Sequence, residues 1–241
     1  MTSNPMIRNS RIEETIMDSA PMTISGSINK TLILLGTVVL FAFLSWSLCA
    51  QGYTDRAYLL MIISSIAGFI VALITFFKPK ISPVTAPAYA ICEGLLVGAI
   101  SYGYNSLYSG IVVNAVIITL LALLTMLFLY KVKAIQATEK FRKVVFTSTL
   151  AIAIFYFAGI IGALFGHPMT IFNGGIYGII ISLVICVVAA LNFILDVDFV
   201  EKAEGRLPNY FEWYAGLSLL ITVIWLYFEI LRLLAQLNRR N

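Results

Sequence analysis

The stretch IYGIIISLVICVVAALNFILDVDFVEKAEG, residues 176–205, decides the fold class. It begins with a long, almost entirely apolar run, and two aspartates, Asp196 and Asp198, close that run just before the chain turns polar. A helix that crosses a bilayer needs about 20 predominantly apolar residues. The run has that length, so it predicts a membrane-spanning helix over residues 176–197.

Six further apolar runs of similar length occur along the chain, at 31–50, 57–77, 86–104, 110–130, 144–165 and 213–235. Of the 241 residues, 60% are hydrophobic and only 12% are charged, which lies far from the composition of a soluble domain. The runs are long and apolar on all sides, whereas a β-barrel would show short alternating segments. The sequence therefore predicts an all-α integral membrane protein with seven transmembrane helices.

The predicted spans occupy most of the chain and leave no room for a folded soluble domain. We expect residues 1–28 to form a flexible tail and residues 29–241 to form one transmembrane domain. Three glycine pairs at a spacing of four residues indicate close contacts between helices. These pairs are Gly94 with Gly98, Gly162 with Gly166, and Gly174 with Gly178.

Basic residues predict the orientation, because cytoplasmic loops retain Lys and Arg. With the N-terminus inside, the inner side carries twelve of them: Arg8, Arg11, Lys30, Lys78, Lys80, Lys131, Lys133, Lys140, Arg142, Lys143, Lys202 and Arg206. The outer loops carry only Arg56, so we expect a cytoplasmic N-terminus. Arg239 and Arg240 would then lie outside, either as a tolerated short tail, which we favour, or because the seventh segment does not fully cross. The net charge of +4 indicates contact with anionic lipids and gives no reason to invoke nucleic acid.

Ionisable residues at membrane depth are costly and mark functional hypotheses. Glu93 lies near the middle of APAYAICEGLLVGAISYGY and is the acid expected to be most deeply buried. It is either a protonated side chain that bonds a neighbouring helix or part of an ion or proton path. Asp196 and Asp198 lie about 200° apart around a helix, so they share a face only if the helix ends between them. Asn192, four residues before Asp196, extends a polar stripe on the same face.

Other charged residues can be explained by structural roles. Asp198 and Glu201 fit a solvated helix end. Glu229 and Arg232, three residues apart in the last helix, fit a structural ion pair. Glu212 begins that helix on the inner side and could meet Asp196, whereas Glu229 lies about 25 Å further along the helix and could not.

Catalytic patterns are missing from the sequence. It contains no His-Glu-x-x-His, Gly-x-Ser-x-Gly or Gly-x-Gly-Asp motif and no nucleotide-binding glycine loop. The three cysteines, Cys49, Cys92 and Cys186, lack the spacing of a metal site or redox pair. We therefore expect no enzymatic activity and no cofactor, and the remaining functions are a channel or leak, a proton-coupled transporter, or a membrane adaptor.

Three stretches resemble the Bax inhibitor-1 family, also called the transmembrane Bax inhibitor motif family, in its bacterial YccA-like branch. They are LNFILDVDFVEKAEGRLPNYFEWYAGLSLLITVIWLYFEILRLL at 191–234, AYAICEGLLVGAIS at 88–101 and SNP at 3–5. The resemblance implies six helices around the last one, a cytoplasmic N-terminus and, in a bacterium, the plasma (inner) membrane. It also implies a pH-sensitive calcium leak that closes when two aspartates, one each in the sixth and seventh helices, share a proton.

Carried onto this chain, the sixth-helix aspartate falls on Asp196 or Asp198, and the seventh-helix position falls on Thr222. Threonine is not a second carboxylate, so Glu93 or Glu212 would have to complete an acidic pair. The span 57–77 also lacks the basic residue that relatives place near the site. Oxygen ligands for a hard cation could come from Asp196, Asp198, Glu93, Asn192 and Thr222, with the two aspartates as the expected metal ligands.

The leading expectation is a calcium or other cation leak with a carboxylate site near the inner end of the sixth helix. The alternative is a non-conducting regulator of a membrane-anchored ATP-dependent protease, which would use residues 1–28 as an unstructured handle. A proton-coupled exporter based on Glu93 is a weaker third option. The partners expected are the lipid bilayer and a cation, and for the alternative function that protease.

Overall fold

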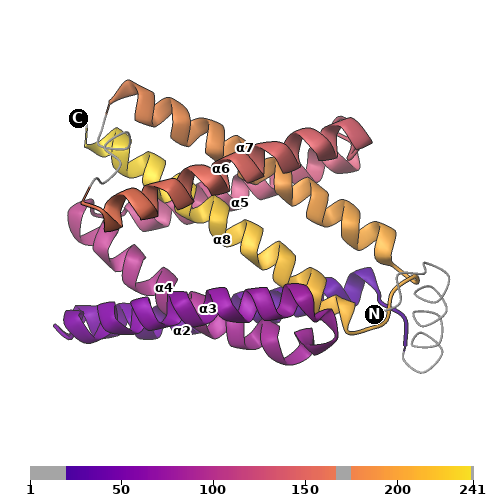
Figure 1. Ribbon diagram of the computed structural model, residues 1–241, viewed down its shortest axis with the longest axis horizontal. Helices are drawn as coiled ribbons and strands as arrows, with labels where there is room; N and C mark the ends of the chain where they lie inside the picture. Colours follow the sequence, from indigo (N-terminus) through magenta and orange to yellow (C-terminus); the bar gives the residue numbers. More distant parts are fainter. Residues whose placement is uncertain (1–19, 167–174, 240–241) are drawn as a thin grey trace. The chain divides into compact units, whose positions relative to one another are not determined.

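A computed structural model of the chain describes residues 20–166 and 175–239. These ranges contain seven helices that are long and apolar enough to cross a membrane: α2 (Ile24–Ala50), α3 (Thr54–Phe77), α4 (Ser82–Leu107), α5 (Ile111–Lys131), α6 (Glu139–Leu164), α7 (Ile176–Ala203) and α8 (Phe211–Asn238) (Figure 1). A short 3₁₀ turn, η1 (Pro79–Ile81), precedes α4, and the described ranges contain no β-strand. The predicted all-α class and all seven spans are confirmed, and the chain is an integral, multi-pass membrane protein.

Two helices extend well beyond the predicted spans. The helix α2 begins at Ile24 because Thr23 caps it, its hydroxyl accepting a hydrogen bond from the Gly26 amide at 2.9 Å. The helix α7 continues without a break to Ala203. Residues 20–28, which we assigned to the tail, therefore include the cap and first turn of a helix, and the aspartates lie inside a helix rather than at its end.

The chain divides into two compact units. The first holds residues up to Gly103 together with Val197–Leu220, and the second holds Tyr104–Asp196 together with the residues from Ile221 onward. The helices α7 and α8 therefore contribute to both units.

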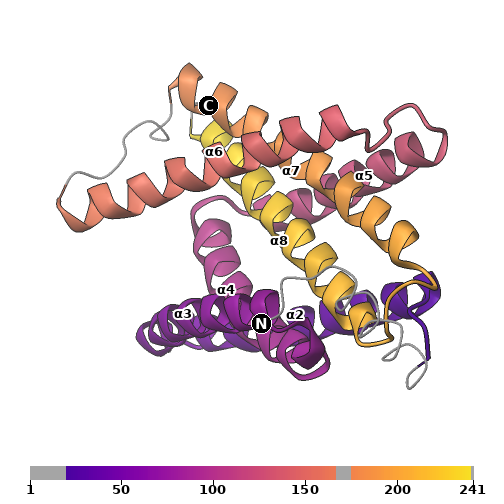
Figure 2. The ribbon, with the colours of Figure 1, turned by 45° about the vertical axis from the view of Figure 1, so that its right-hand side comes forward.

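In the first unit, α2 and α3 lie side by side in both views (Figure 1, Figure 2). Glycines of α4 contact α2 where no side chain would fit. A Cβ atom at Gly94 would lie 2.7 Å from the Val38 carbonyl oxygen, and one at Gly98 would overlap the Ala42 carbonyl. This pair packs as predicted. Gly166 instead lies just after the end of α6, with a φ of +80° and no atom within 4 Å of its Cβ position, and Gly174 lies outside the described residues.

The first unit also contains a clasp, which we define as residues 20–24 bound to residues 204–212. The Met22 amide donates to the Leu207 carbonyl at 2.8 Å, and the Gly205 amide donates to the Met22 carbonyl at 2.9 Å. The Asn209 amide donates to the Ala20 carbonyl at 3.0 Å. Met22 is fully buried. The start of α2 is therefore joined to the loop between α7 and α8.

The helix α8 is the most buried of the seven, with 56% of its most apolar window buried, against 6% for α6. This agrees with an interior position for the last helix. The arrangement of six helices around it stays a prediction.

Candidate functional site

The helices α7 and α8 meet in the second unit at a buried polar contact. The Thr222 hydroxyl donates a hydrogen bond to Asp196 Oδ2 at 2.5 Å. Thr222 is 6% exposed, and Asp196 is half-buried. Of the two aspartates that the resemblance left open, Asp196 is thus the one that contacts the predicted seventh-helix position.

Asp198 has a different environment. Both of its carboxylate oxygens lie 2.9 Å from Lys202 Nζ, one helical turn further along α7. Asp198 is 6% exposed, so the expectation of a solvated helix end is wrong for this residue, whereas Glu201 is exposed as expected. Because α7 is unbroken here, Asp196 and Asp198 point in different directions.

Glu212 belongs to the clasp. Its Oε1 accepts hydrogen bonds from the Thr23 amide at 3.0 Å and from the Thr23 hydroxyl at 2.9 Å. A Cβ atom at Gly26 would overlap this carboxylate, so the glycine lets it reach the start of α2. A carboxylate at a helix N-terminus is favoured by the helix dipole. These contacts give Glu212 a structural role in the clasp, and its role as a second acid stays a prediction.

Glu93 is only half-buried, so the expectation that it is the most buried acid is wrong. Tyr89, one turn earlier in α4, interacts with its carboxylate. We expected either a bond to a neighbouring helix or a place on an ion or proton path, and both stay predictions. Glu93 belongs to the first unit, whereas Asp196 and Thr222 belong to the second.

Among the residues that the structure describes, the most buried acid is Glu229, at 1% exposure. Its carboxylate lies 3.3 Å from Arg232 NH1, which is the ion pair predicted from the sequence. The Tyr156 hydroxyl of α6 and the Trp225 indole also donate to Glu229, at 2.7 and 3.1 Å. Arg232 in turn donates to the Tyr156 hydroxyl. Tyr156 was missed by the sequence reasoning, although a tyrosine deep in an apolar run needs a partner for its hydroxyl.

Asn192 connects α7 to α6. Its side-chain amide donates to the Thr149 hydroxyl at 2.7 Å and to the Val188 carbonyl at 2.9 Å. The predicted polar stripe toward Asp196 therefore faces two partner helices, with Asn192 bound to α6 and Asp196 bound to α8.

Polar residues follow one face of α8 through the second unit: Thr222, Trp225, Glu229, Arg232 and Gln236. Near the far end of α8, the buried Gln236 bonds Ser182 of α7 at 3.1 Å. The pairs Asp196–Thr222 and Ser182–Gln236 fix α7 and α8 in one antiparallel register. They are separated by about 21 Å along the helices. A continuous polar face thus runs along the most buried helix.

The described residues contain no group of three or more His, Cys, Asp or Glu side chains that could hold a metal ion. Because Asp196 and Asp198 also face different partners, a joint metal site on these two residues is not supported. Asp196 and Thr222 bring one carboxylate and one hydroxyl together, and such a pair of oxygen groups can bind a proton or a passing cation.

The family model described as Bax inhibitor 1 like matches residues 4–239, nearly the whole chain. No curated protein matches the chain. No solved structure matches it. The seven membrane helices, their order and the family match agree with the resemblance found in the sequence, and the chain belongs to the Bax inhibitor 1 like family.

Proposed function

We propose that this membrane protein is a pH-sensitive cation leak with calcium as the permeant ion. Asp196 is its ion- and proton-binding group, and Thr222 is the partner that holds the path closed. The observation that carries the proposal is the 2.5 Å hydrogen bond between Thr222 and Asp196. An acid at membrane depth costs about 2.5–3.5 kcal/mol on insertion scales, so its presence favours a role in transport.

The chemistry follows from the charge of one carboxylate. Ionised Asp196 attracts a hard cation, and the Thr222 hydroxyl supplies a second oxygen beside it. In the closed state that hydroxyl donates to the carboxylate and ties α7 to α8. Protonation removes the charge that attracts the cation, so flux decreases as the pH falls. The proposal requires no catalytic group and no cofactor.

Calcium flux into proteoliposomes tests the proposal. We expect the wild-type protein to conduct above empty liposomes, with flux that rises from acidic to weakly alkaline pH. Asp196→Asn removes the charge and is expected to abolish the pH-dependent flux. Asp55→Asn is the matched control, because Asp55 is an exposed carboxylate in the first turn of α3.

Two outcomes would contradict the proposal: no flux at any pH, or an Asp196→Asn variant that conducts like the control. The first would favour the alternative of a non-conducting regulator of a membrane-anchored protease. That alternative is tested by deleting the tail, and the deletion must stop at residue 19 because residues 20–24 form the clasp. Loss of the cellular phenotype with intact flux would support the regulator.

A further inference from the structure

Of the seven helices that are long and apolar enough to cross a membrane, α6 is the least buried. Only 6% of its most apolar window is buried, although Thr149 and Tyr156 bond other helices from its inner face. In a membrane protein such a surface faces lipid. The grooves on this surface and the charge of the residues that line them therefore indicate which lipid it could bind.

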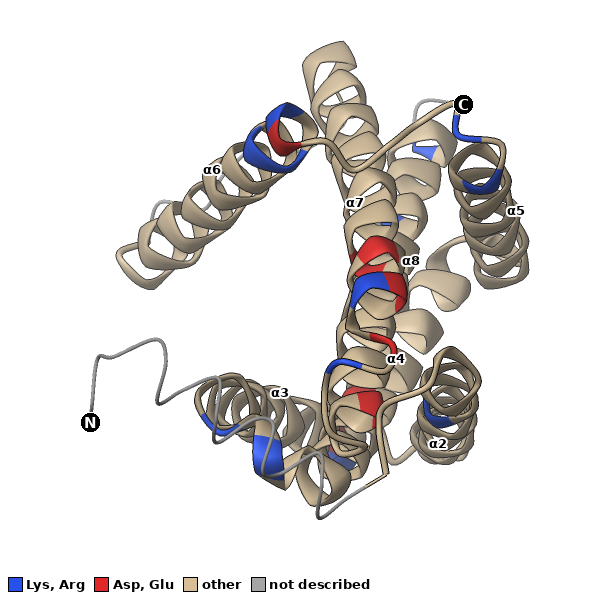
Figure 3. Ribbon diagram, turned by 90° about the vertical axis from the view of Figure 1, so that its right-hand side faces the viewer, with Lys and Arg blue, Asp and Glu red and all other residues tan. Residues whose placement is uncertain are grey.

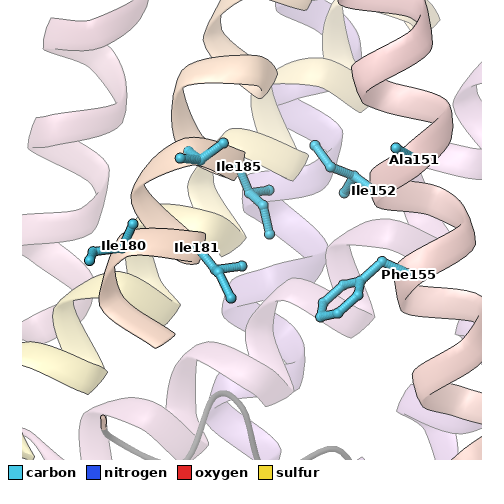
Figure 4. A pocket seen from close by; sticks show the side chains of 7 residues that line it. Ala151, Ile152, Phe155, Ile180, Ile181 and Ile185 are labelled. Atoms are coloured by element: carbon cyan, nitrogen blue, oxygen red, sulfur yellow. The ribbon is translucent and has the colours of Figure 1, made fainter. Parts of the chain in front are cut away.

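An apolar groove of about 340 Å³ lies between α6 and α7. Figure 4 shows Ile152 and Phe155 of α6 pointing toward α7, with Ile181 and Ile185 on the opposite wall. All of the side chains that line it are apolar. Its volume lies within the range of sites that hold small molecules, about 300–1,000 Å³.

A second hollow, of about 300 Å³, lies nearer the start of α6. The residues of this helix that line it are Lys143, Val144, Thr147 and Ser148. Together with Ala151 and Phe155 of the groove, these residues follow one stripe, because they recur every three or four positions. The stripe extends about 18 Å along the helix from Lys143 to Phe155.

The polar side chains of this stripe lie toward the start of α6. Lys143 is exposed there beside Val144, the hydroxyl groups of Thr147 and Ser148 follow, and the groove beyond them is lined by apolar side chains only. Figure 3 shows basic residues gathered at the first turns of α6, beside one acidic residue. These are Lys140, Arg142 and Lys143, with Glu139. A lysine at a helix end extends its ammonium group toward the head-group level.

We propose that the stripe is a binding site for one anionic phospholipid. The phosphate binds Lys143, the glycerol and ester groups lie beside Thr147 and Ser148, and one acyl chain enters the groove between α6 and α7. The charge of Lys143 selects an anionic over a zwitterionic head group, and the groove holds the chain. The site is separate from Asp196 and does not depend on ion flux.

Native mass spectrometry tests the site, with protein taken from bilayers of equimolar phosphatidylglycerol and phosphatidylcholine. We expect one phosphatidylglycerol to be retained in preference to phosphatidylcholine. Lys143→Gln is expected to reduce that preference about fivefold, as for loss of one lysine near an anionic membrane. Lys131→Gln, an exposed lysine at the end of α5, is the matched control and should keep the preference.

Ala151→Trp tests the acyl chain independently. Ala151 is exposed and lines the groove, so a tryptophan fills the groove without entering the protein core. We expect retention of both lipids to fall to the background level, whereas Ala153→Trp, on a neighbouring exposed face, should behave like the wild type. The proposal is overturned by equal retention of the two lipids in the wild type, by an equal effect of Lys131→Gln and Lys143→Gln, or by unchanged retention in Ala151→Trp.

Discussion

Thr222 differs from a carboxylic acid in how it can bind Asp196. Two carboxylates at hydrogen-bond distance must share a proton, and they repel each other when both are ionised. A hydroxyl can donate to ionised Asp196 and can accept from protonated Asp196, so this contact survives in either state. In the proposed leak, the pH dependence then follows the charge of Asp196.

Thr222→Asp should therefore steepen the pH dependence. We expect low flux at acidic pH, where one proton joins the pair, and a larger rise than in the wild type once both carboxylates ionise and separate. Thr222→Val, which keeps the shape, should raise resting flux about fivefold through loss of a hydrogen bond worth about 1 kcal/mol. Calcium flux in proteoliposomes measures both. A Thr222→Asp variant with the wild-type pH profile would argue against a gate at this contact.

Glu229 and Arg232 make a second residue-level prediction, on stability. Glu229 is 1% exposed, so Arg232→Met leaves a buried carboxylate without its cation. Breaking a buried pair in this way costs about 3 kcal/mol or more. The double variant Glu229→Gln with Arg232→Met should recover most of that loss, because both charges are then absent.

Thermal unfolding in detergent measures this cycle. Arg239→Gln, an exposed arginine beyond the end of α8, is the control and should leave the unfolding temperature unchanged. Equal destabilisation in Arg232→Met and in the double variant would show that the charges are not coupled.

At the scale of elements, the contact between α2 and α4 depends on glycine. Gly98→Ala places a methyl group onto the Ala42 carbonyl, so we expect a destabilisation of about 1–3 kcal/mol. Gly36→Ala, in α2, is the matched control because nothing lies within 4 Å of its Cβ position. Alanine is the better helix former by about 0.5–1 kcal/mol, so the control should be neutral or stabilising. Thermal unfolding compares the two variants. A lower unfolding temperature in Gly98→Ala but not in Gly36→Ala would confirm that packing dominates at Gly98, and equal changes in both would contradict it.

The same scale shows what could be predicted from the sequence. Helix number and type follow from the length of apolar runs, because a bilayer imposes both. The end of α7 was harder to place, since the charge of Asp198 suggested water. Lys202, one turn later, neutralises that charge and lets the helix continue with Asp198 buried.

Partners distant in the sequence could not be predicted from local patterns. Glu212 binds Thr23, 189 positions away, and Glu229 binds Tyr156, 73 positions away. Neither pair shares a helix, so no spacing rule reveals it. The position of Thr222 opposite Asp196 was reached through the family resemblance, and the local pattern alone offered Glu212 and Glu93 instead.

At the scale of the whole molecule, an odd number of spans places the two ends of the chain on opposite sides of the membrane. The distribution of Lys and Arg predicts a cytoplasmic N-terminus. The loop after α2 and the end of α8 should then lie outside, and the loop between α5 and α6 should lie inside. The outer position of the end of α8 has the weakest support from charge, because Arg239 and Arg240 would lie on the outer side.

Single cysteines test this orientation in a variant whose buried or half-buried native cysteines, Cys49, Cys92 and Cys186, are replaced by alanine. Gln51→Cys and Asn238→Cys should react with a membrane-impermeant maleimide in sealed right-side-out vesicles. Ala134→Cys should react only after permeabilisation, and all three positions are exposed. Protection of Asn238→Cys alone would mean that α8 does not fully cross. Because α8 carries Thr222, that result would also place the polar face of α8 at a different depth and remove the basis for a path through the membrane.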